Sequence, residues 1–404
     1  GRLEVAGRSG RELAAVGSAL GLYVHIPFCA AICNYCNFNR GLFDADQKSR
    51  YLDALLSEIQ LAPSLPGPGF AAETPGAVPA DTVFFGGGTP SLLAAEDIAA
   101  ILAALRQSYA LAADAEITLE ANPETVTVAS LSGYRAAGVN RVSFGVQSFR
   151  DDELRRLSRL HGVDRARAAY GEARTAGFDN VSLDLMMWLP GQSVEQWLTS
   201  VDAAIALAPE HLSLYLLEVY PNAPLKDEMA RARWSQAPDD DAARMYDEAM
   251  TRLEQVGLHQ YEISNVARAG RQSRHNLKYW RDEAWRAFGC GAHSTRDGVR
   301  WKNVSAIEDY MARLRSAVPE SVMTEVRRLT AEERLGDALF TGLRLTEGLS
   351  LADIRARYGV DVWERYGDDL QPFADEGLLV RTPERLWLTR RGMLLAHEVM
   401  AVFV

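Results

Sequence analysis

Alternating β-rich and helical segments fill the first two-thirds of the chain, and this alternation limits the fold more than any other feature. Short runs of β-branched and aromatic residues predict six strands, at residues 21–25, 82–85, 116–120, 141–146, 181–185 and 211–217. Helical periodicity separates them, at residues 46–62, 93–106, 128–137, 164–176 and 193–207. Six β-then-α units in series predict a parallel sheet with right-handed crossovers. A barrel, open or closed, and a doubly wound sheet both satisfy this pattern.

The pattern changes from about residue 305 onward. Helical periodicity and a short hairpin are predicted there, with helices at 331–344, 350–358 and 361–376, hairpin strands at 378–380 and 386–388, and a last helix from Arg390. Helices followed by a small hairpin resemble a winged-helix domain, and a helical cap on the barrel is the alternative. We therefore divide the chain into an N-terminal segment (1–20), a β/α domain with its C-terminal extension (21–300) and a C-terminal domain (301–404).

Composition excludes several classes of protein. Apolar residues make up 48% and charged residues 24% of the 404 residues, as in a soluble globular protein. The net charge of −11 argues against nucleic acid as a partner, because nucleic acid attracts a positive field. No run near 18 apolar residues predicts a membrane span, and residues 1–21 lack the pattern of a signal peptide. The expected location is the cytoplasm.

Three of the four cysteines lie within eight residues, in a C-x3-C-x2-C loop directly after the first predicted strand. Cys29, Cys33 and Cys36 so close together indicate a metal or cluster site in a reducing compartment rather than disulfides. A four-iron cubane needs four ligands, and three thiolates leave one iron open to a small molecule. A zinc-stabilised binding module is a remote alternative, because no fourth zinc ligand follows the loop and His25 is better explained as a packed side chain.

The cysteine loop, with an aromatic residue (Tyr35) before its last cysteine, resembles the radical S-adenosylmethionine (SAM) superfamily. In that superfamily the open iron is chelated by the amino and carboxylate groups of SAM. The reduced cluster then cleaves SAM to a 5′-deoxyadenosyl radical. The resemblance implies a partial (β/α)6 barrel, a [4Fe–4S] cluster, SAM, and an electron donor of the flavodoxin or ferredoxin type.

Polar and glycine residues at successive strand ends match the superfamily's SAM site. The resemblance implies cofactor contacts by Tyr23, Tyr35, Gly87, Gly88, Thr89, Glu120, Gln147, Arg159 and Asp184. Barrel sites are built at the carboxyl ends of strands, and a glycine triplet allows a ligand to approach the backbone closely. Glu120 and Asp184 interrupt apolar runs, so we expect a buried partner for each: the ligand's ammonium, its ribose hydroxyls, or Arg159.

Further motifs narrow the resemblance to one subgroup. The phrases HIPFC, GGGTPS, EANPE, GVQSF, RLHG, LPGQS, QYEISN, HNLKYW and GCGAHS are similar to oxygen-independent coproporphyrinogen III dehydrogenases and to HemW-type heme chaperones. The dehydrogenases carry a further cysteine where this chain has Phe38, and a long extension where only 22 residues precede Tyr23. We therefore expect a heme chaperone that delivers heme to respiratory acceptor proteins. Radical decarboxylation of coproporphyrinogen III is the alternative, so whether the chain is an enzyme stays open.

The motif His275-Asn-Leu-Lys-Tyr-Trp280 supplies the predicted heme contacts His275, Tyr279 and Trp280, since neutral imidazole is a common ligand of heme iron. The alternative is that these side chains brace a loop at the barrel mouth. Cys290 and His293 are less favoured as heme ligands.

One residue departs from the family pattern. Trp188 stands where the family usually has glycine, so we expect its ring to narrow that side of the pocket. The sequence leaves peripheral contact with the membrane open, since a heme donor can touch a membrane without an anchor.

Overall fold

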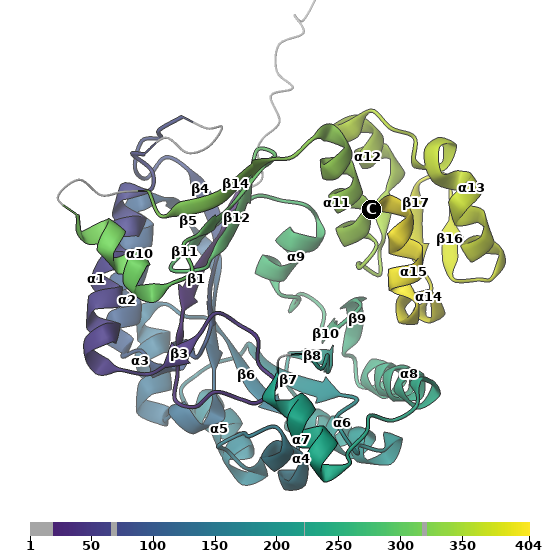
Figure 1. The fold of residues 1–404 in the computed structure, drawn as a ribbon, viewed down its shortest axis with the longest axis horizontal. Helices are drawn as coiled ribbons and strands as arrows, with labels where there is room; N and C mark the ends of the chain where they lie inside the picture. Colours follow the sequence, from purple (N-terminus) through teal and green to yellow (C-terminus); the bar gives the residue numbers. More distant parts are fainter. Residues whose placement is uncertain (1–18, 66–70, 222, 317–320) are drawn as a thin grey trace, which may run out of the picture.

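The computed structural model describes residues 19–65, 71–221, 223–316 and 321–404, so the predictions for residues 1–18 lie outside it (Figure 1). Six parallel strands form the centre of a 12-stranded sheet and follow one another in chain order. They are β1 (Leu20–Ile26), β4 (Pro79–Gly87), β5 (Ala110–Ala121), β6 (Arg141–Gln147), β7 (Val181–Met187) and β8 (His211–Leu216). The predicted partial (β/α)6 barrel is confirmed, and no closing pair joins β8 to β1 among the described residues.

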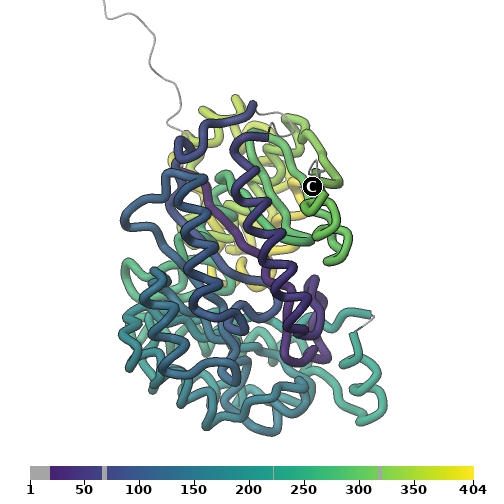
Figure 2. The backbone as a smooth tube through the Cα atoms, turned by 90° about the vertical axis from the view of Figure 1, so that its left-hand side faces the viewer, coloured from purple at the N-terminus to yellow at the C-terminus, as the bar shows by residue number. Residues whose placement is uncertain are grey.

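Helices follow the strands and cover the convex face of the sheet, where α1 and α2 run along the outside (Figure 2). The helices between the central strands are α1 (Ala45–Leu61), α2 (Ala95–Ser108), α3 (Val128–Ala137), α4 (Asp151–Arg156), α5 (Val163–Thr175) and α6 (Val194–Leu207). Local signals explain their starts: the Asp44 carboxylate accepts the Gln47 N–H at 2.7 Å, and Ser193 with Gln196 forms a capping box. The short helix α4 was not predicted.

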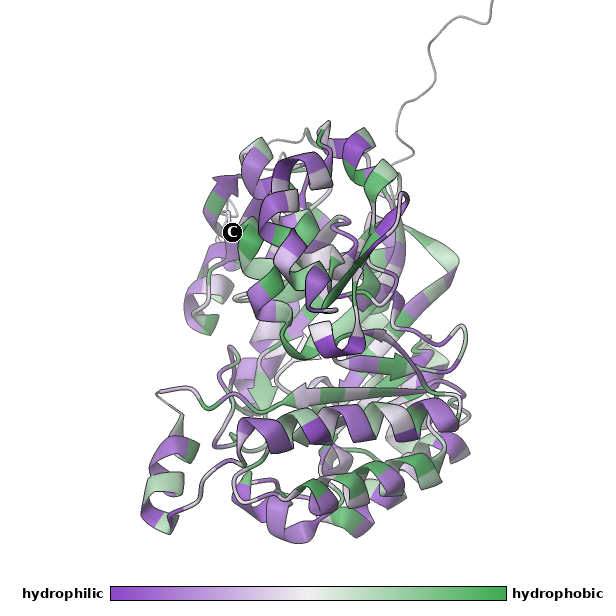
Figure 3. Cartoon of the chain, turned by 90° about the vertical axis from the view of Figure 1, so that its right-hand side faces the viewer, coloured by the Kyte–Doolittle hydropathy of each residue, from purple (hydrophilic) through white to green (hydrophobic). Residues whose placement is uncertain are grey.

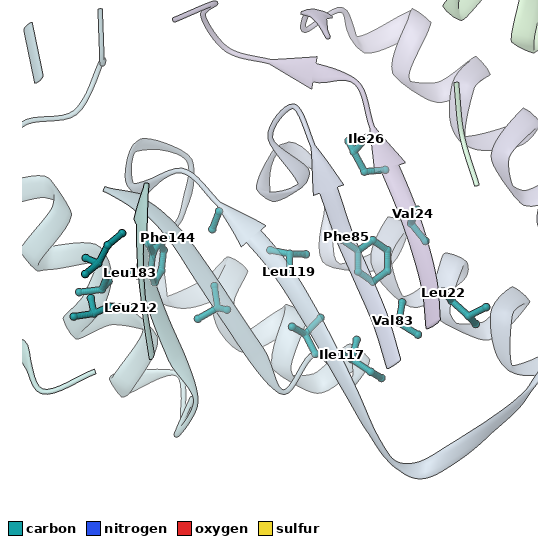
Figure 4. Packing of buried hydrophobic residues seen from close by; sticks show 14 of the residues in the cluster. Leu22, Val24, Ile26, Val83, Phe85, Ile117, Leu119, Phe144, Leu183 and Leu212 are labelled. Carbon is teal, nitrogen blue, oxygen red and sulfur yellow. The ribbon is translucent and has the colours of Figure 1, made fainter. Parts of the chain in front are cut away.

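Alternate residues of the central strands build the main core. Leu22, Val24 and Ile26 of β1 are fully buried towards the outer helices, next to Phe85 of β4 (Figure 4). The intervening Tyr23 points to the concave side, because successive side chains of a strand alternate between its faces. The helices show hydrophilic and hydrophobic residues side by side, as expected for amphipathic helices (Figure 3).

The sheet extends beyond the barrel at both edges. Strand β11 (Trp285–Phe288) pairs in parallel with β1, followed by the antiparallel strands β12 (His293–Arg296), β13 (Val299–Asn303) and β14 (Met323–Arg328). Beside β8 lie β10 (Asn265–Ala267) and β9 (His259–Glu262). The predicted domain boundary after residue 300 falls inside β13, because β13 and β14 continue the main sheet. These strands are short, and their stability comes from pairing that no local pattern reveals.

Helices outside the repeated units complete the β/α domain. They are α7 (Pro224–Ala232), α8 (Asp239–Gln255), α9 (Arg274–Trp280) and α10 (Ile307–Arg315). Figure 1 shows α9 on the concave side of the sheet and α10 beside α1 on the outside.

The C-terminal helices and hairpin occur close to where the sequence predicts them. They are α11 (Ala331–Gly342), α12 (Leu351–Tyr358), α13 (Val362–Asp375), the hairpin β16 (Leu379–Arg381) and β17 (Arg385–Leu388), and α14 (Arg390–Leu394). A two-residue strand, β15 (Leu349–Ser350), was not predicted and completes a three-stranded sheet in the order β15-β17-β16. The chain ends in α15 (Ala396–Met400) and a 3-10 turn, and the domain is winged-helix-like.

Candidate cluster and cofactor site

A cavity of about 440 Å³ opens at the carboxyl ends of the central strands. It brings together nearly all of the predicted cluster and SAM residues, namely Cys29, Cys33, Tyr35, Cys36, Gly87, Gly88, Thr89, Glu120, Gln147, Arg159 and Asp184. Tyr23 is the exception: its ring lies deeper, stacked with Phe84 at 6.2 Å between centroids, and its hydroxyl is 3.3 Å from His25 Nδ1. Side chains far apart in sequence thus meet at one edge of the sheet.

The cysteine loop is fixed at several points by residues that are not cysteines. Asn34, between the second and third cysteines, donates to Glu228 Oε2 of α7 at 2.7 Å and to the Arg156 carbonyl at 2.8 Å. Asn39 donates to the carbonyl of Cys290 at 3.2 Å. His25 is packed, as predicted, with Nε2 2.8 Å from the Asn39 carbonyl oxygen. Both asparagines lie inside the motif-dense loop, which is the sequence signal that could have singled them out.

The glycine triplet lies at the end of β4, where its backbone packs closely against the residues that lead into the cysteine loop. The N–H groups of Gly88 and Thr89 donate to the carbonyls of Ile26 and Phe28, both at 2.7 Å. A Cβ on Gly88 would lie 2.6 Å from the Phe28 oxygen, so only glycine allows this close approach. Strand β4 is therefore held directly against the cysteine loop, whose first part forms β2 (Phe28–Cys29) and pairs with β3 (Gly41–Leu42).

The three thiols line the same cavity, and two of them have side-chain donors beside them. Thr89 Oγ1 lies 3.7 Å from Cys29 Sγ, and Arg159 Nη1 lies 3.4 Å from Cys33 Sγ. Burial raises the pKa of the Cys29 thiol, which the Thr89 hydroxyl opposes. Within the described ranges, no three His, Cys, Asp or Glu side chains are placed to hold a single metal ion. A cubane cluster distributes its thiolates over several iron atoms, so this donor set fits a cluster with three protein ligands.

Two carboxyl groups form the opposite wall of the cavity. Burial, reinforced by the neighbouring Asp184, raises the pKa of Glu120 to about 8, and the Gly87 N–H is 3.3 Å from Glu120 Oε2. Burial also raises the pKa of Asp184, whose Oδ1 accepts from Ser143 Oγ at 3.1 Å. Two carboxyls in one desolvated wall create a place for a ligand cation such as an ammonium group.

Arg159 was one of the predicted partners of Glu120 and Asp184, but among the described residues it forms no direct ion pair with either carboxyl. Its Nη2 donates to the Gly145 carbonyl, and its other terminal nitrogen points to Cys33. The guanidinium therefore stands on the cluster side of the cavity, where it can bind an anionic group of a ligand.

Gln147 sits in a strained turn at the end of β6. Its φ of 71° is in the left-handed region, and the Ser148 N–H donates to the Val146 carbonyl at 2.9 Å across it. The buried His161 lies with Nε2 3.1 Å from the same carbonyl, which stabilises the turn. Gln147 Oε1 is buried and has no hydrogen-bond partner among the described residues, so it can accept a ligand hydroxyl. The supporting role of His161 was not predicted.

Trp188 does not narrow the cavity, contrary to the prediction. Its indole N–H donates to the Ala237 carbonyl at 2.7 Å, and the ring is absent from the cavity lining. The backbone at Trp188 has a φ of 62°, a conformation that favours glycine. The unusual residue thus changes backbone strain rather than the shape of the pocket.

The residues predicted to contact heme lie away from this cavity. His275 is 1% exposed, and both of its ring nitrogens lie 2.8 Å from a hydroxyl, Nδ1 from Thr82 and Nε2 from Tyr279. Burial lowers the pKa of His275 to about 3. Neither nitrogen is open to an iron atom in this arrangement, because the imidazole braces α9 against the beginning of β4.

Trp280 and Cys290 are also engaged elsewhere. Trp280 lies beneath the guanidinium of Arg344, 4.3 Å from the ring centroid, and lines a separate cavity with the C-terminal domain. Cys290 is fully buried, which raises the pKa of its thiol to about 12. The structure therefore places the HNLKYW helix on the concave side of the sheet and buries Cys290 of the GCGAHS motif, and neither motif lines the cluster cavity.

Known proteins resemble the chain over nearly its whole length. It matches the Radical SAM superfamily over residues 23–204 and the HemN C-terminal domain over residues 329–395. It is 36% identical to the heme chaperone HemW of Bacillus subtilis, covering 95% of this chain and 98% of that protein. The HemW of Haemophilus influenzae is 40% identical, with 95% and 98% covered.

Two further matches agree with this similarity. A mouse protein described as radical S-adenosyl methionine domain-containing protein 1, mitochondrial, is 35% identical over 94% of this chain and 85% of its own length. The solved coproporphyrinogen III oxidase HemN of Escherichia coli shares the fold, with a TM-score of 0.81 and 24% identity over 96% of this chain and 90% of that one.

Among the described residues, none of the helices is both long and apolar enough to cross a membrane. Family membership implies a [4Fe–4S] cluster and SAM, for which the thiols and the cavity wall provide fitting groups. The cysteine loop, the six-strand half-barrel, the C-terminal domain and the near-full-length similarity lead to one assignment: the chain belongs to the radical SAM superfamily and, within it, to the family of HemW heme chaperones.

Proposed function

We propose that this protein is a heme chaperone, which binds heme and transfers it to acceptor proteins of the respiratory chain. The similarity to HemW heme chaperones over 95% of the chain carries the proposal. The residue at position 38 supports it. Phe38 lines the mouth of the cavity and is 64% exposed, at the position where the resembling dehydrogenases have a further cysteine.

The cavity residues divide into three groups in this proposal. Cys29, Cys33 and Cys36 hold the cluster through their thiolates, and a bound cluster with SAM supplies one-electron chemistry at the cavity. Glu120 and Asp184 would accept hydrogen bonds from the amino group and the ribose hydroxyls of SAM, whereas Gln147 offers its unpartnered amide oxygen to a hydroxyl. Arg159 holds the carboxylate of SAM, because its guanidinium stands beside the cysteine loop. Tyr35, Gly87, Gly88 and Thr89 shape the wall between them.

The surface around the cysteine loop suits partner proteins. Ile32, Phe38, Leu42 and Phe43 are exposed apolar side chains in one segment next to the cluster ligands. Such a rim fits docking of a flavodoxin- or ferredoxin-type electron donor, of a heme acceptor, or of a membrane surface touched peripherally. All four cysteines are free, which suits a cytoplasmic location with a reducing environment.

Heme titration into the anaerobically reconstituted protein tests the proposal. A Soret shift that saturates at one heme per chain, followed by heme transfer to an apo-cytochrome, is the expected result. Unchanged free-heme absorption throughout the titration contradicts it.

A parallel assay addresses the dehydrogenase alternative, which the shared fold with HemN keeps in view. The reconstituted protein is incubated with SAM, a reductant and coproporphyrinogen III. The chaperone proposal predicts no loss of propionate carboxyl groups, and protoporphyrinogen formation would replace that proposal with the enzyme.

A further inference from the structure

A second, smaller recess lies on the concave side of the sheet extension, away from the helices of the outer layer. It has a volume of about 250 Å³ and is lined by Trp285, His293, Ser294, Arg300, Trp301, Lys302 and Glu325. None of these residues has a role in the cluster and SAM cavity. The recess combines two indole rings, an imidazole, two cations and the carboxylate of Glu325.

The register of the strands places the important side chains on one face. Trp285 pairs with Thr295, Thr295 with Arg300, and His293 with Lys302. Residues directly opposite each other in antiparallel strands share a face, so Trp285, His293, Arg300 and Lys302 point the same way. This is the concave side, since Trp285 also meets Tyr279 of α9 edge to face, with 4.7 Å between ring centroids.

His293 is the accessible histidine of this face. Its side chain is exposed, and neither ring nitrogen has a hydrogen-bond partner among the described residues. Its backbone is fixed, because the Trp285 indole N–H donates to the His293 carbonyl at 2.8 Å. Partial desolvation of the ring and the neighbouring Lys302 lower the pKa of His293, which favours the neutral imidazole with a lone pair for a metal.

Two cations flank this imidazole. Lys302 Nζ lies 3.6 Å from Glu325 and Arg300 Nη2 lies 2.9 Å from Asp337, and all four side chains remain partly exposed. Each cation has donors beyond its single ion pair, so each can also bind a carboxylate of a ligand.

Heme consists of a flat apolar ring, an iron atom that binds imidazole, and two carboxylates. The recess offers a partner for each of these parts. We propose that heme docks on the concave face of β11–β13 with His293 as its axial ligand, Trp285 against the macrocycle, and Arg300 and Lys302 at the propionates. This inference rests on the proposed heme chaperone function and specifies the site for it. The recess encloses only part of a porphyrin, which leaves one edge open for transfer.

In this arrangement the HNLKYW motif supports the heme site structurally and does not bind the iron itself. His275 holds the Tyr279 hydroxyl, Tyr279 packs against Trp285, and Trp285 holds the backbone of His293. The buried histidine of the motif thus supports the exposed one through two aromatic rings. His293 is also close enough to His25, which holds the cysteine loop, to influence the pKa of that residue electrostatically.

The test compares three full-length reconstituted proteins in a titration with ferric heme: the wild type, His293→Ala, and His259→Ala. His259 is an exposed histidine at the far edge of the same sheet and serves as the matched control. We expect His293→Ala to weaken heme affinity by about tenfold or more and to shift the Soret and EPR signals, because an axial bond is lost. Added imidazole should restore the ligated spectrum, and His259→Ala should match the wild type.

Titration with metal-free protoporphyrin IX distinguishes binding of the porphyrin ring from ligation of the iron. Its affinity should be unchanged in His293→Ala and reduced in Trp285→Ala. The double variant Arg300→Gln/Lys302→Gln should weaken heme binding but leave the affinity for heme dimethyl ester unchanged.

If the wild type binds heme and His293→Ala binds it with the same affinity and spectrum, this site is wrong and the chaperone proposal stands. If the wild type binds no heme, both proposals fail.

Discussion

Arg159 Nη1 lies 3.4 Å from Cys33 Sγ, so a permanent cation borders the loop that carries the cluster ligands. The guanidinium is held there by the Gly145 carbonyl, which accepts from its other terminal nitrogen. Because arginine stays charged at all relevant pH values, it stabilises negative charge on the thiolates and on a reduced cluster.

Replacing this cation should lower the reduction potential of the reconstituted cluster. A unit charge about 4 Å away contributes roughly 4 kcal/mol at an effective dielectric constant of 20, which is on the order of 200 mV for one electron. Arg159→Gln should show this decrease in an EPR-monitored redox titration without SAM. Arg159→Lys keeps the charge and should shift less; equal potentials in all three proteins would exclude an electrostatic role.

The raised pKa of Glu120 predicts a pH-dependent affinity for SAM. Its pKa of about 8 means that the carboxyl is mainly protonated at pH 7, whereas the amino N–H donors and the sulfonium charge of SAM favour the carboxylate. Binding should therefore release a proton, and SAM affinity should rise from pH 6 to pH 8. Calorimetry in buffers of different ionisation enthalpy measures this release. Glu120→Gln should remove both the pH dependence and the proton release.

The same group predicts how stability varies with pH. A carboxyl whose pKa is raised by folding stabilises the protein fully below the unfolded pKa, and this contribution is lost as the pH rises towards 8. Between the unfolded pKa and pH 8, the free energy of unfolding should fall less for Glu120→Gln than for the wild type. Urea titrations at several pH values measure this difference. Parallel pH profiles for the two proteins would show that Glu120 ionises freely.

The glycine triplet offers a matched pair of substitutions. Gly88→Ala would place a methyl group 2.6 Å from the Phe28 oxygen, so we expect a loss of about 1–3 kcal/mol in stability and poor cluster retention. Gly171→Ala lies on α5 with no atom within 4 Å and should stabilise the protein by about 0.5–1 kcal/mol. Iron content and urea midpoints measure both effects, and normal iron loading of Gly88→Ala would contradict the close approach.

Trp188→Gly tests whether the unusual tryptophan shapes the pocket. Glycine relieves backbone strain of about 1 kcal/mol at φ 62° but removes the indole hydrogen bond to Ala237. SAM affinity should stay within about twofold of the wild type, because the ring does not line the cavity. Trp188→Phe keeps the strain and loses only the hydrogen bond, so its thermal stability separates the two effects. A large gain in SAM affinity in either variant would show that the ring does reach the ligand.

Strongly periodic elements could be predicted closely from the sequence. The helix predicted at 128–137 is α3 to the residue, and the C-terminal helices differ by one or two residues at their ends. Strands β9 to β14 were not predicted. These unpredicted strands include β11 and β12, which carry Trp285 and His293 of the proposed heme site.

Local sequence also identified the cysteines and several polar residues of the cavity, whereas the rest of its lining and the geometry around them came from the fold. The motifs located the cysteines and the carboxyl pair, because these residues interrupt regular patterns. They did not reveal that His275 is enclosed between Thr82 and Tyr279, since Thr82 is 193 residues away in the chain. They also missed that Trp188 points away from the ligand.

The sequence by itself determined the β/α succession, the three-thiolate loop and the family, because spacing and periodicity are properties of the chain alone. Only the tertiary structure decided which histidine is enclosed and which is accessible. Exposure depends on which distant strands and helices cover a side chain, and His275 is covered because α9 packs against β4 of the sheet.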